Sequence, residues 1–140
     1  MIVLSALTDA HNLSGRQIDG IWHTGVHVFG REYYFGGGGT SASSSGITNS
    51  TPRAFQAMSG FGPTRTVRLG TTTRSRADFE QYLRTITPNW TCGSYSMLTH
   101  NCNNFSDTVS QYLVGKRIPS YITYVQCLVL RLDLTAAHQT

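Results

Sequence analysis

One predicted helix, opened by a cysteine, constrains the fold of this 140-residue chain more than any other segment. Asn101 is a preferred helix N-cap type, because its side-chain oxygen can accept a hydrogen bond from a backbone N–H that has no partner within the helix. Apolar residues then recur with helical spacing, at Phe105, Val109, Tyr112 and Leu113. Gly115 marks a C-terminal stop, and Pro119 follows shortly after it. The sequence predicts a helix from Cys102 to about residue 113 or 114.

The position of Cys102 in the first turn suggests a nucleophile. Unpaired N–H groups and the helix dipole favour an anion at this end of a helix. Such an environment is expected to lower the pKa of a thiol, and the thiolate is the reactive form. A cysteine nucleophile also needs a base, which must be a histidine from elsewhere in the chain. The alternative, an inert buried thiol, is the interpretation that we favour for Cys92 and Cys127, which have no base or cap signal beside them.

The candidate base lies in a predicted strand over residues 20–29, where side chains alternate between two faces. His23, Gly25 and His27 share one of these faces. The glycine between the two histidines leaves space for another group to approach. Spacing alone does not choose between His23 and His27 as the base, and a histidine satisfied by a hydrogen bond in a half-buried strand is the alternative for His23.

Four motifs, in this order, resemble the PPPDE domain, a family of permuted papain-fold peptidases that includes the DeSI-type desumoylating isopeptidases. They are Gly20–Thr24, Glu32–Gly38, His100–Ser106 and Ile118–Ile122. The resemblance extends from about residue 16 to residue 124, which is most of the chain. It implies a His–Cys dyad with the histidine first in the chain. Carried over by position, His23 is the catalytic histidine and Cys102 is the nucleophile.

Neighbours of Cys102 are expected to support this site. Asn101 and Asn103 are expected to cap the helix and to orient groups near the thiol, and His100 to pack against the turn or support it. The backbone N–H of Cys102 is the natural candidate for an oxyanion donor, because it lies at a helix N-terminus. No acidic third member is identifiable in the sequence, so only a dyad is predicted.

The resemblance implies an α+β fold, with a small antiparallel sheet or barrel packed against two or three helices in a permuted papain-like order. We expect residues 1–134 to form a single domain and residues 135–140 a loose tail, while the apolar stretch 125–134 fits either a helix or a strand. The first seven residues suit a short strand, and a polar loop is expected over residues 8–14. This start is shorter than the family's, which puts the first strand in doubt and with it a sheet edge.

Short sequence signals predict the elements between the histidine strand and the cysteine helix. Phe29-Gly30-Arg31 suits a tight hairpin turn into a strand over residues 32–35. Residues 36–50 are rich in glycine, serine and threonine, which predicts either a flexible surface loop or a side-chain-free lining for an extended diglycine tail. A further strand is expected over residues 64–69, and the helix that follows begins at Ser75.

Composition narrows the classes of function. Eleven basic against seven acidic residues give a net charge of +4, but the basic residues are scattered, so no nucleic-acid partner is expected. Three cysteines without C-x-x-C spacing indicate a reducing compartment, and neither a secretory signal nor a run of membrane-spanning length is visible. We therefore expect a cytoplasmic protein that could also be nuclear. The histidine and cysteine spacings match no known zinc pattern, so no metal is expected.

The resemblance implies a cysteine isopeptidase that acts on SUMO or ubiquitin conjugates and needs no cofactor. A protein thioesterase, for example a depalmitoylase, would use the same dyad but a groove that admits an acyl chain. A non-catalytic binding module that keeps the fold is a third interpretation, against which the intact His23 and Cys102 argue. The family also suggests a homodimer.

Overall fold

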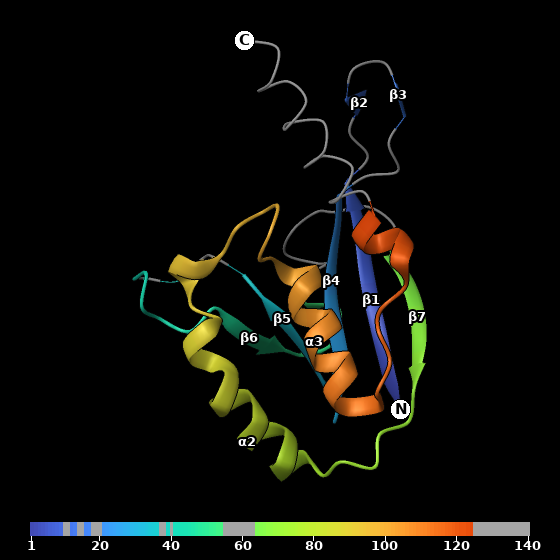
Figure 1. The fold of residues 1–140 in the computed structure, drawn as a ribbon. Helices are drawn as coiled ribbons and strands as arrows, with labels where there is room; N and C mark the ends of the chain where they lie inside the picture. Colours follow the sequence, from blue (N-terminus) through green and yellow to red (C-terminus); the bar gives the residue numbers. More distant parts are fainter. Residues whose placement is uncertain are drawn as a thin grey trace.

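The fold is built on a five-stranded antiparallel sheet with the strand order β6-β5-β4-β1-β7 (Figure 1). The computed structural model describes residues 1–9, 12–13, 16–17, 21–36, 39, 41–54 and 64–124. The strands of this sheet are β1 (Ile2–Asp9), β4 (Ile21–Val28), β5 (Arg31–Phe35), β6 (Ile47–Ser50) and β7 (Thr64–Gly70). Two short strands, β2 (Asn12–Leu13) and β3 (Arg16–Gln17), pair separately. The sheet is open and packs against helices, which confirms the predicted α+β class.

Strand β1 is an inner strand, so the doubt about the family's first strand was wrong. It pairs with β4 on one side and with β7 on the other. Ile2, Leu4 and Ala6 are fully buried on one of its faces, which is the period-two burial of a strand. Pairing with β4 continues to Asp9, beyond the predicted seven residues, because Ile21 and its neighbours supply partners that the N-terminal sequence alone does not reveal. In the part of the chain that the structure describes, the sheet edges are β6 and β7.

Strands β4 and β5 form the predicted hairpin. Phe29 and Gly30 turn the chain with positive φ angles of 51° and 75°, a conformation that glycine adopts without strain and that matches the twist of hairpin strands. The sequence predicted only loop over residues 36–50, yet β6 lies within this segment and pairs with β5. Ile47 is its one apolar residue and threonine, asparagine and serine follow, so no apolar alternation marked this edge strand in the sequence.

Two helices follow the sheet strands. Helix α2 (Arg76–Ile86) begins as predicted at Ser75, which forms a capping box with Asp78. Two 3-10 turns, η1 (Thr87–Asn89) and η2 (Cys92–Ser94), then lead to helix α3 (Cys102–Val114). Helix α3 ends at Gly115, whose φ of 66° is the left-handed stop that the sequence predicted. Residues 120–124 are also helical.

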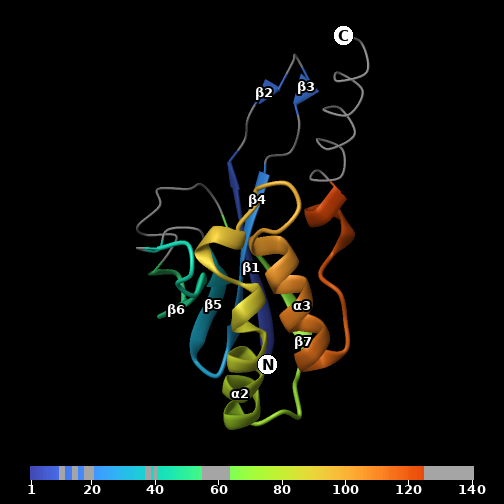
Figure 2. The ribbon, with the colours of Figure 1, turned by 60° about the vertical axis from the view of Figure 1, so that its left-hand side comes forward.

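The helices α2 and α3 lie on the same face of the sheet (Figures 1 and 2). The core between the layers is aromatic: Phe35 of β5 packs edge-to-face on Trp90, with ring centroids 5.0 Å apart, and Tyr33 packs on Phe79 of α2 at the same distance. Residues facing α3 along β4 are Thr24, Val26 and Val28, all of them buried. The start of β4 therefore meets the start of α3 at one end of the sheet.

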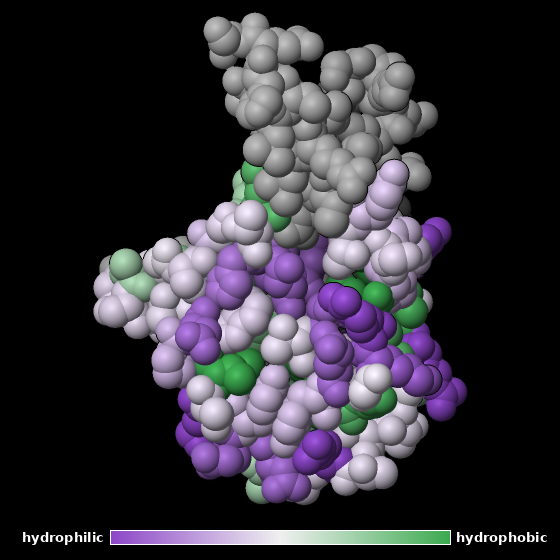
Figure 3. Space-filling view, viewed as in Figure 1, coloured by the Kyte–Doolittle hydropathy of each residue, from purple (hydrophilic) through white to green (hydrophobic). Residues whose placement is uncertain are grey.

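Three predictions fall on residues that the structure leaves undescribed, namely the stretch 125–134, the tail 135–140 and Cys127. None of the helices in the described ranges has the length and apolar character that a membrane span requires. Seen from the side of α3, the surface is mostly polar, with scattered apolar patches (Figure 3).

Candidate active site

Cys102 occupies the first turn of α3, as the sequence predicted. The Asn101 side-chain oxygen accepts hydrogen bonds from the backbone N–H groups of Asn103 and Asn104, at 2.9 and 3.3 Å. Asn104 returns the interaction by accepting from the Asn101 backbone N–H at 3.0 Å. This reciprocal cap fixes the first turn and leaves the backbone N–H of Cys102 outside the cap bonds.

Strand β4 holds the start of α3 through residues on both sides of His23. The buried hydroxyl of Thr24 lies 2.9 Å from Asn103 Oδ1, 2.9 Å from Ser106 Oγ and 3.4 Å from the Cys102 carbonyl oxygen. The Asn103 amide donates to the carbonyl oxygen of Trp22 at 3.0 Å. The structure thus brings Cys102 to the main chain of the strand that carries His23, although 78 residues separate Thr24 from Cys102.

The thiol of Cys102 is buried and neutral. Burial raises its pKa from the ordinary value, against the opposing hydrogen bonds from backbone N–H groups, that of Thr24 first, and from the Tyr95 hydroxyl. The expectation that the helix start would lower this pKa was therefore wrong, because removing the thiolate from water outweighs the helix terminus. The thiol lies 3.7 Å from Asn103 Oδ1, which suits a protonated sulfur as donor. Asn103 is then both a link to β4 and a direct neighbour of the sulfur.

His23 is neutral at physiological pH. Burial lowers its pKa to about 4, and the charge of Glu32 acts in the opposite direction. Its ring lies edge-on to Tyr34, with centroids 5.9 Å apart. Two neutral groups, a thiol and an imidazole, are the resting state that these environments favour, rather than a preformed ion pair.

The prediction that Gly25 makes room for another group is confirmed, and the group is Glu32. A Cβ atom at Gly25 would lie 2.5 Å from Glu32 Oε1, so a side chain there would have to displace the carboxylate. Glu32 Oε2 lies 3.3 Å from Nε2 of His27, the rival candidate for the base. His27 also lines a cavity of ≈650 Å³ with Ser5 and residues of the hairpin turn. His27 thus pairs with a carboxylate. Both histidines lie on the face of β4 opposite Thr24, and His23 is the one whose chain neighbours, Trp22 and Thr24, contact the start of α3.

His100 packs on the aromatic core beside the start of α3. Its ring stacks on Trp90, with centroids 4.2 Å apart and planes 21° apart, and lies 5.3 Å from the ring of Phe35. Its Nδ1 lies 2.9 Å from the Ser94 carbonyl oxygen. Backbone hydrogen bonds between Ser96 and His100 close a short turn over the start of α3. These contacts agree with the packing role expected for His100.

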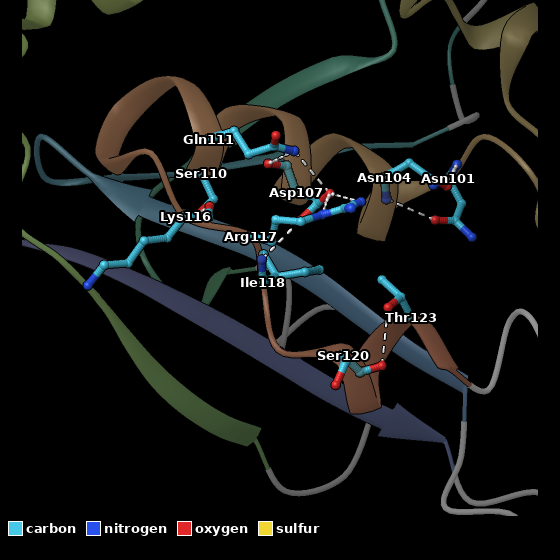
Figure 4. Close-up of polar contacts among 10 residues, drawn as sticks. All are labelled: Asn101, Asn104, Asp107, Ser110, Gln111, Lys116, Arg117, Ile118, Ser120 and Thr123. Carbon is cyan, nitrogen blue, oxygen red and sulfur yellow. Dashed lines mark hydrogen bonds and ion pairs between the residues drawn. The ribbon is translucent and has the colours of Figure 1, made fainter.

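The loop after α3 is tied to the same helix by one carboxylate. Asp107 accepts from Nη2 and Nε of Arg117, at 2.9 and 3.2 Å, and from the backbone N–H of Ile118 at 2.9 Å (Figure 4). Both arginine groups donate to Oδ2, and the Ile118 N–H donates to Oδ1, so each carboxylate oxygen has a partner in this loop. The motif that begins at Ile118 is therefore anchored to the middle of α3, one turn beyond the nucleophile.

Tyr95 is a site residue that the sequence analysis missed. Its hydroxyl hydrogen bonds to the Cys102 thiol and approaches the Cys102 backbone N–H, and burial raises the pKa of this phenol to about 12. Its ring packs on Phe35, with centroids 5.1 Å apart. No periodic pattern of apolar residues before α3 marks Tyr95 in the sequence. Only the turn between Ser96 and His100 directs this side chain to the sulfur.

Other cysteine and histidine arrangements are not assembled in the described ranges. Cys92 is free, and its sulfur lies 3.4 Å from the Ser45 carbonyl oxygen, away from the start of α3. Among the residues that the structure describes, no three cysteine, histidine or acidic side chains gather as a metal site would require.

The sequence comparison decides the family. Residues 4–137 match the family model described as "PPPDE putative peptidase domain". The chain belongs to the PPPDE peptidase family. This PPPDE chain is therefore a member of a family of cysteine-type hydrolases, as its resemblance implied.

Several curated proteins resemble this PPPDE chain over most of its length. Desumoylating isopeptidase 1 of Xenopus laevis is 39% identical over 124 residues, which cover 88% of this chain and 68% of that protein. The Homo sapiens protein of the same name is 38% identical over 117 residues, covering 83% and 64%. A homologue from Caenorhabditis elegans is 31% identical over 104 residues, covering 74% and 30%. The PPPDE chain thus spans about two thirds or less of these relatives.

Proposed function

We propose that this chain is a cysteine isopeptidase that removes SUMO from protein lysines, with Cys102 as nucleophile and His23 as base. One observation carries the proposal: Cys102, whose thiol is buried, stands at the start of α3, where its carbonyl oxygen and the Asn103 side chain hydrogen bond to Thr24 and Trp22, the two neighbours of His23 in β4. SUMO is proposed because similar proteins from frog, rat and human bear the name desumoylating isopeptidase.

The neutral resting pair defines the first chemical step. His23 takes the proton from the Cys102 sulfur as the sulfur attacks the carbonyl carbon of the modifier's terminal glycine. A pKa of about 4 leaves the imidazole free to accept that proton at neutral pH. The imidazolium then protonates the leaving lysine amine, the C–N bond breaks, and a thioester remains on Cys102. Water, deprotonated by His23, hydrolyses this thioester and restores the thiol.

Two donors near the sulfur suit the oxyanion that forms in this step. The backbone N–H of Cys102 lies outside the helix cap bonds, and the Tyr95 hydroxyl approaches both this N–H and the sulfur. Donors fixed before the reaction stabilise developing charge without reorganisation. We assign the oxyanion site to this pair.

Two further properties rest on the family resemblance. Ubiquitin is the alternative modifier, since it also ends in a diglycine tail, and the homodimer is the predicted assembly. Analytical ultracentrifugation of the purified chain tests the assembly, where a single species at the mass of one chain would contradict it.

Three substrates test the activity, and they differ in the group that the active site must accept: SUMO, ubiquitin or an acyl chain. SUMO joined through an isopeptide bond to a lysine peptide is compared with the matched ubiquitin conjugate and with a palmitoyl-thioester peptide. We expect release of SUMO by the native chain, and none by the Cys102→Ser or His23→Gln variants, whose folding is checked by circular dichroism. Cys92→Ser is the matched control, and we expect it to retain full activity.

The three substrates separate the candidate functions. Faster turnover of the ubiquitin conjugate would replace SUMO as the substrate while keeping the isopeptidase. Turnover of the thioester alone would make the protein a thioesterase. A folded chain that hydrolyses none of them would contradict the enzymatic proposal.

A further inference from the structure

A buried carboxylate stands beside the proposed base, although the sequence revealed no acidic partner for it. Glu32 of β5 is 5% exposed and lies on the sheet face opposite the helices. Three neighbours on that face belong to β4: His23, Gly25 and His27 alternate along the strand, and Glu32 pairs directly with His27 in the strand register.

The side chain of Glu32 reaches along β4 rather than into solvent. Its Oε1 lies over Gly25, where a Cβ atom would come within 2.5 Å, and Gly25 stands between the two histidines. Its Oε2 lies 3.3 Å from His27 Nε2 and accepts from the Arg53 backbone N–H at 3.1 Å. Gly25 therefore admits the carboxylate to the space between His27 and His23.

Glu32 keeps its negative charge in this position. Burial alone would raise the pKa of its carboxyl, but the contact with His27, the hydrogen bond from the Arg53 backbone and electrostatic attraction to both imidazoles bring the pKa below the ordinary value. In turn, Glu32 acts on His23 by favouring the protonated ring. Apart from these groups, the aromatic ring of Tyr34 also borders His23 on this face.

We infer that Glu32 is a positioning residue for His23: its carboxylate, admitted over Gly25, stabilises the imidazolium that forms when Cys102 gives up its proton. The carboxylate gains no proton in the cycle. It lowers the energy of the state in which the proton resides on His23, between its removal from sulfur and its delivery to the leaving amine. Without Glu32, desolvation of the buried imidazolium would be uncompensated. This inference rests on the proposed role of His23 as the base.

The Glu32→Gln variant tests the inference, because it removes the charge at nearly constant shape. We expect kcat for the isopeptide substrate to fall about tenfold, a part of the roughly 10²–10⁴-fold that a positioned general base contributes, with KM unchanged. The His23 ring resonance is followed by NMR from pH 7 to about pH 3 in a Cys102→Ala background, and it should titrate at lower pH in the Glu32→Gln variant than in the parent protein. If Glu32 only stabilised the fold, its substitution would neither lower kcat at unchanged KM nor shift the His23 titration.

Two further variants keep the test decisive. Gly25→Ala retains the charge but displaces the carboxylate, so it should lower kcat in the same direction even if Glu32→Gln does not fold. Asn49→Ala, at an exposed position of β6 outside this cluster, is the control, and we expect kcat within about twofold of the native value.

The NMR titration tests the coupling between Glu32 and His23, and the kinetics test the isopeptidase activity, so either proposal can be contradicted without the other. An unchanged His23 titration in folded Glu32→Gln protein would overturn the inference, whatever the activity. A shifted titration in a chain that cleaves no isopeptide substrate would support the coupling between Glu32 and His23 and would contradict the proposed function instead.

Discussion

At the scale of single residues, the site consists of groups whose burial keeps them neutral. The pKa of Cys102 is raised and that of His23 is lowered, in both cases chiefly by burial. In the proposed mechanism, Cys102 therefore gives its proton to His23 only when substrate arrives. The energetic cost of this arrangement should be visible in the stability of the fold at acid pH.

Acidification should destabilise the protein through His23. The unfolded histidine titrates near pH 6.5 and the folded one near pH 4, so the unfolded state binds more protons between these values and stability falls as the pH drops. The full difference corresponds to about 3 kcal/mol. Urea unfolding at pH 7, 5.5 and 4.5 measures it, with His23→Gln as the variant that should lose less stability over the same range. Equal losses in both proteins would contradict the burial of His23.

Removing the Tyr95 hydroxyl should slow the reaction without unfolding the chain. Tyr95→Phe keeps the ring contact with Phe35 but removes one of the two proposed oxyanion donors. Loss of such a donor typically lowers kcat about 10²–10³-fold. Steady-state kinetics on the SUMO isopeptide substrate measure the effect, and Tyr82→Phe, at a half-buried position of α2, is the control. Unchanged kcat in Tyr95→Phe would exclude the hydroxyl from the reaction.

At the scale of elements, the site depends on how α3 meets β4. The cap of Asn101 fixes the direction of the helix, and Thr24 fixes its distance from the strand. The hydroxyl of Thr24 is fully buried, so water could not take its place as the hydrogen-bond partner of Asn103 and Ser106.

The Thr24→Val substitution should therefore loosen this junction. It preserves shape but leaves Asn103 and Ser106 without their shared partner, at a cost of about 1–3 kcal/mol in the free energy of unfolding. Thr48→Val on edge strand β6 is exposed and should change stability by less than about 0.5 kcal/mol. Urea denaturation compares the two, and equal small effects would show that the hydroxyl does not hold the helix.

At the scale of the whole molecule, β1 joins the hairpin of β4 and β5 to β7. Leu4 is fully buried in this strand, so Leu4→Ala should cost about 2–5 kcal/mol through lost burial and a cavity. Met97, which is 64% exposed, provides the control, and Met97→Ala should have little effect. Thermal unfolding measures both. A small effect of Leu4→Ala would contradict the inner position of β1.

Much of this architecture could be predicted from short-range signals. Capping at Ser75 and Asn101 and the stop at Gly115 placed α2 and α3, and alternation placed β4. Strand β6 could not be predicted because it lacks an apolar alternation, and the full length of β1 could not because pairing with β4 sets where it ends. The same limit applies at the site: Tyr95 and Glu32 reach Cys102 and His23 only through tertiary packing, and the raised pKa of Cys102 depends on a burial that helix position does not reveal.

Covalent capture of the nucleophile tests the central claim most directly. The native chain is incubated with SUMO that carries an electrophile in place of its terminal carboxylate, and its intact mass is measured. We predict one added SUMO on the native chain and on Cys92→Ser, none on Cys102→Ala, and strongly slowed addition on His23→Gln. A folded native chain without the added mass, or an adduct that persists in Cys102→Ala, would contradict the assignment of Cys102 as the nucleophile of a SUMO isopeptidase.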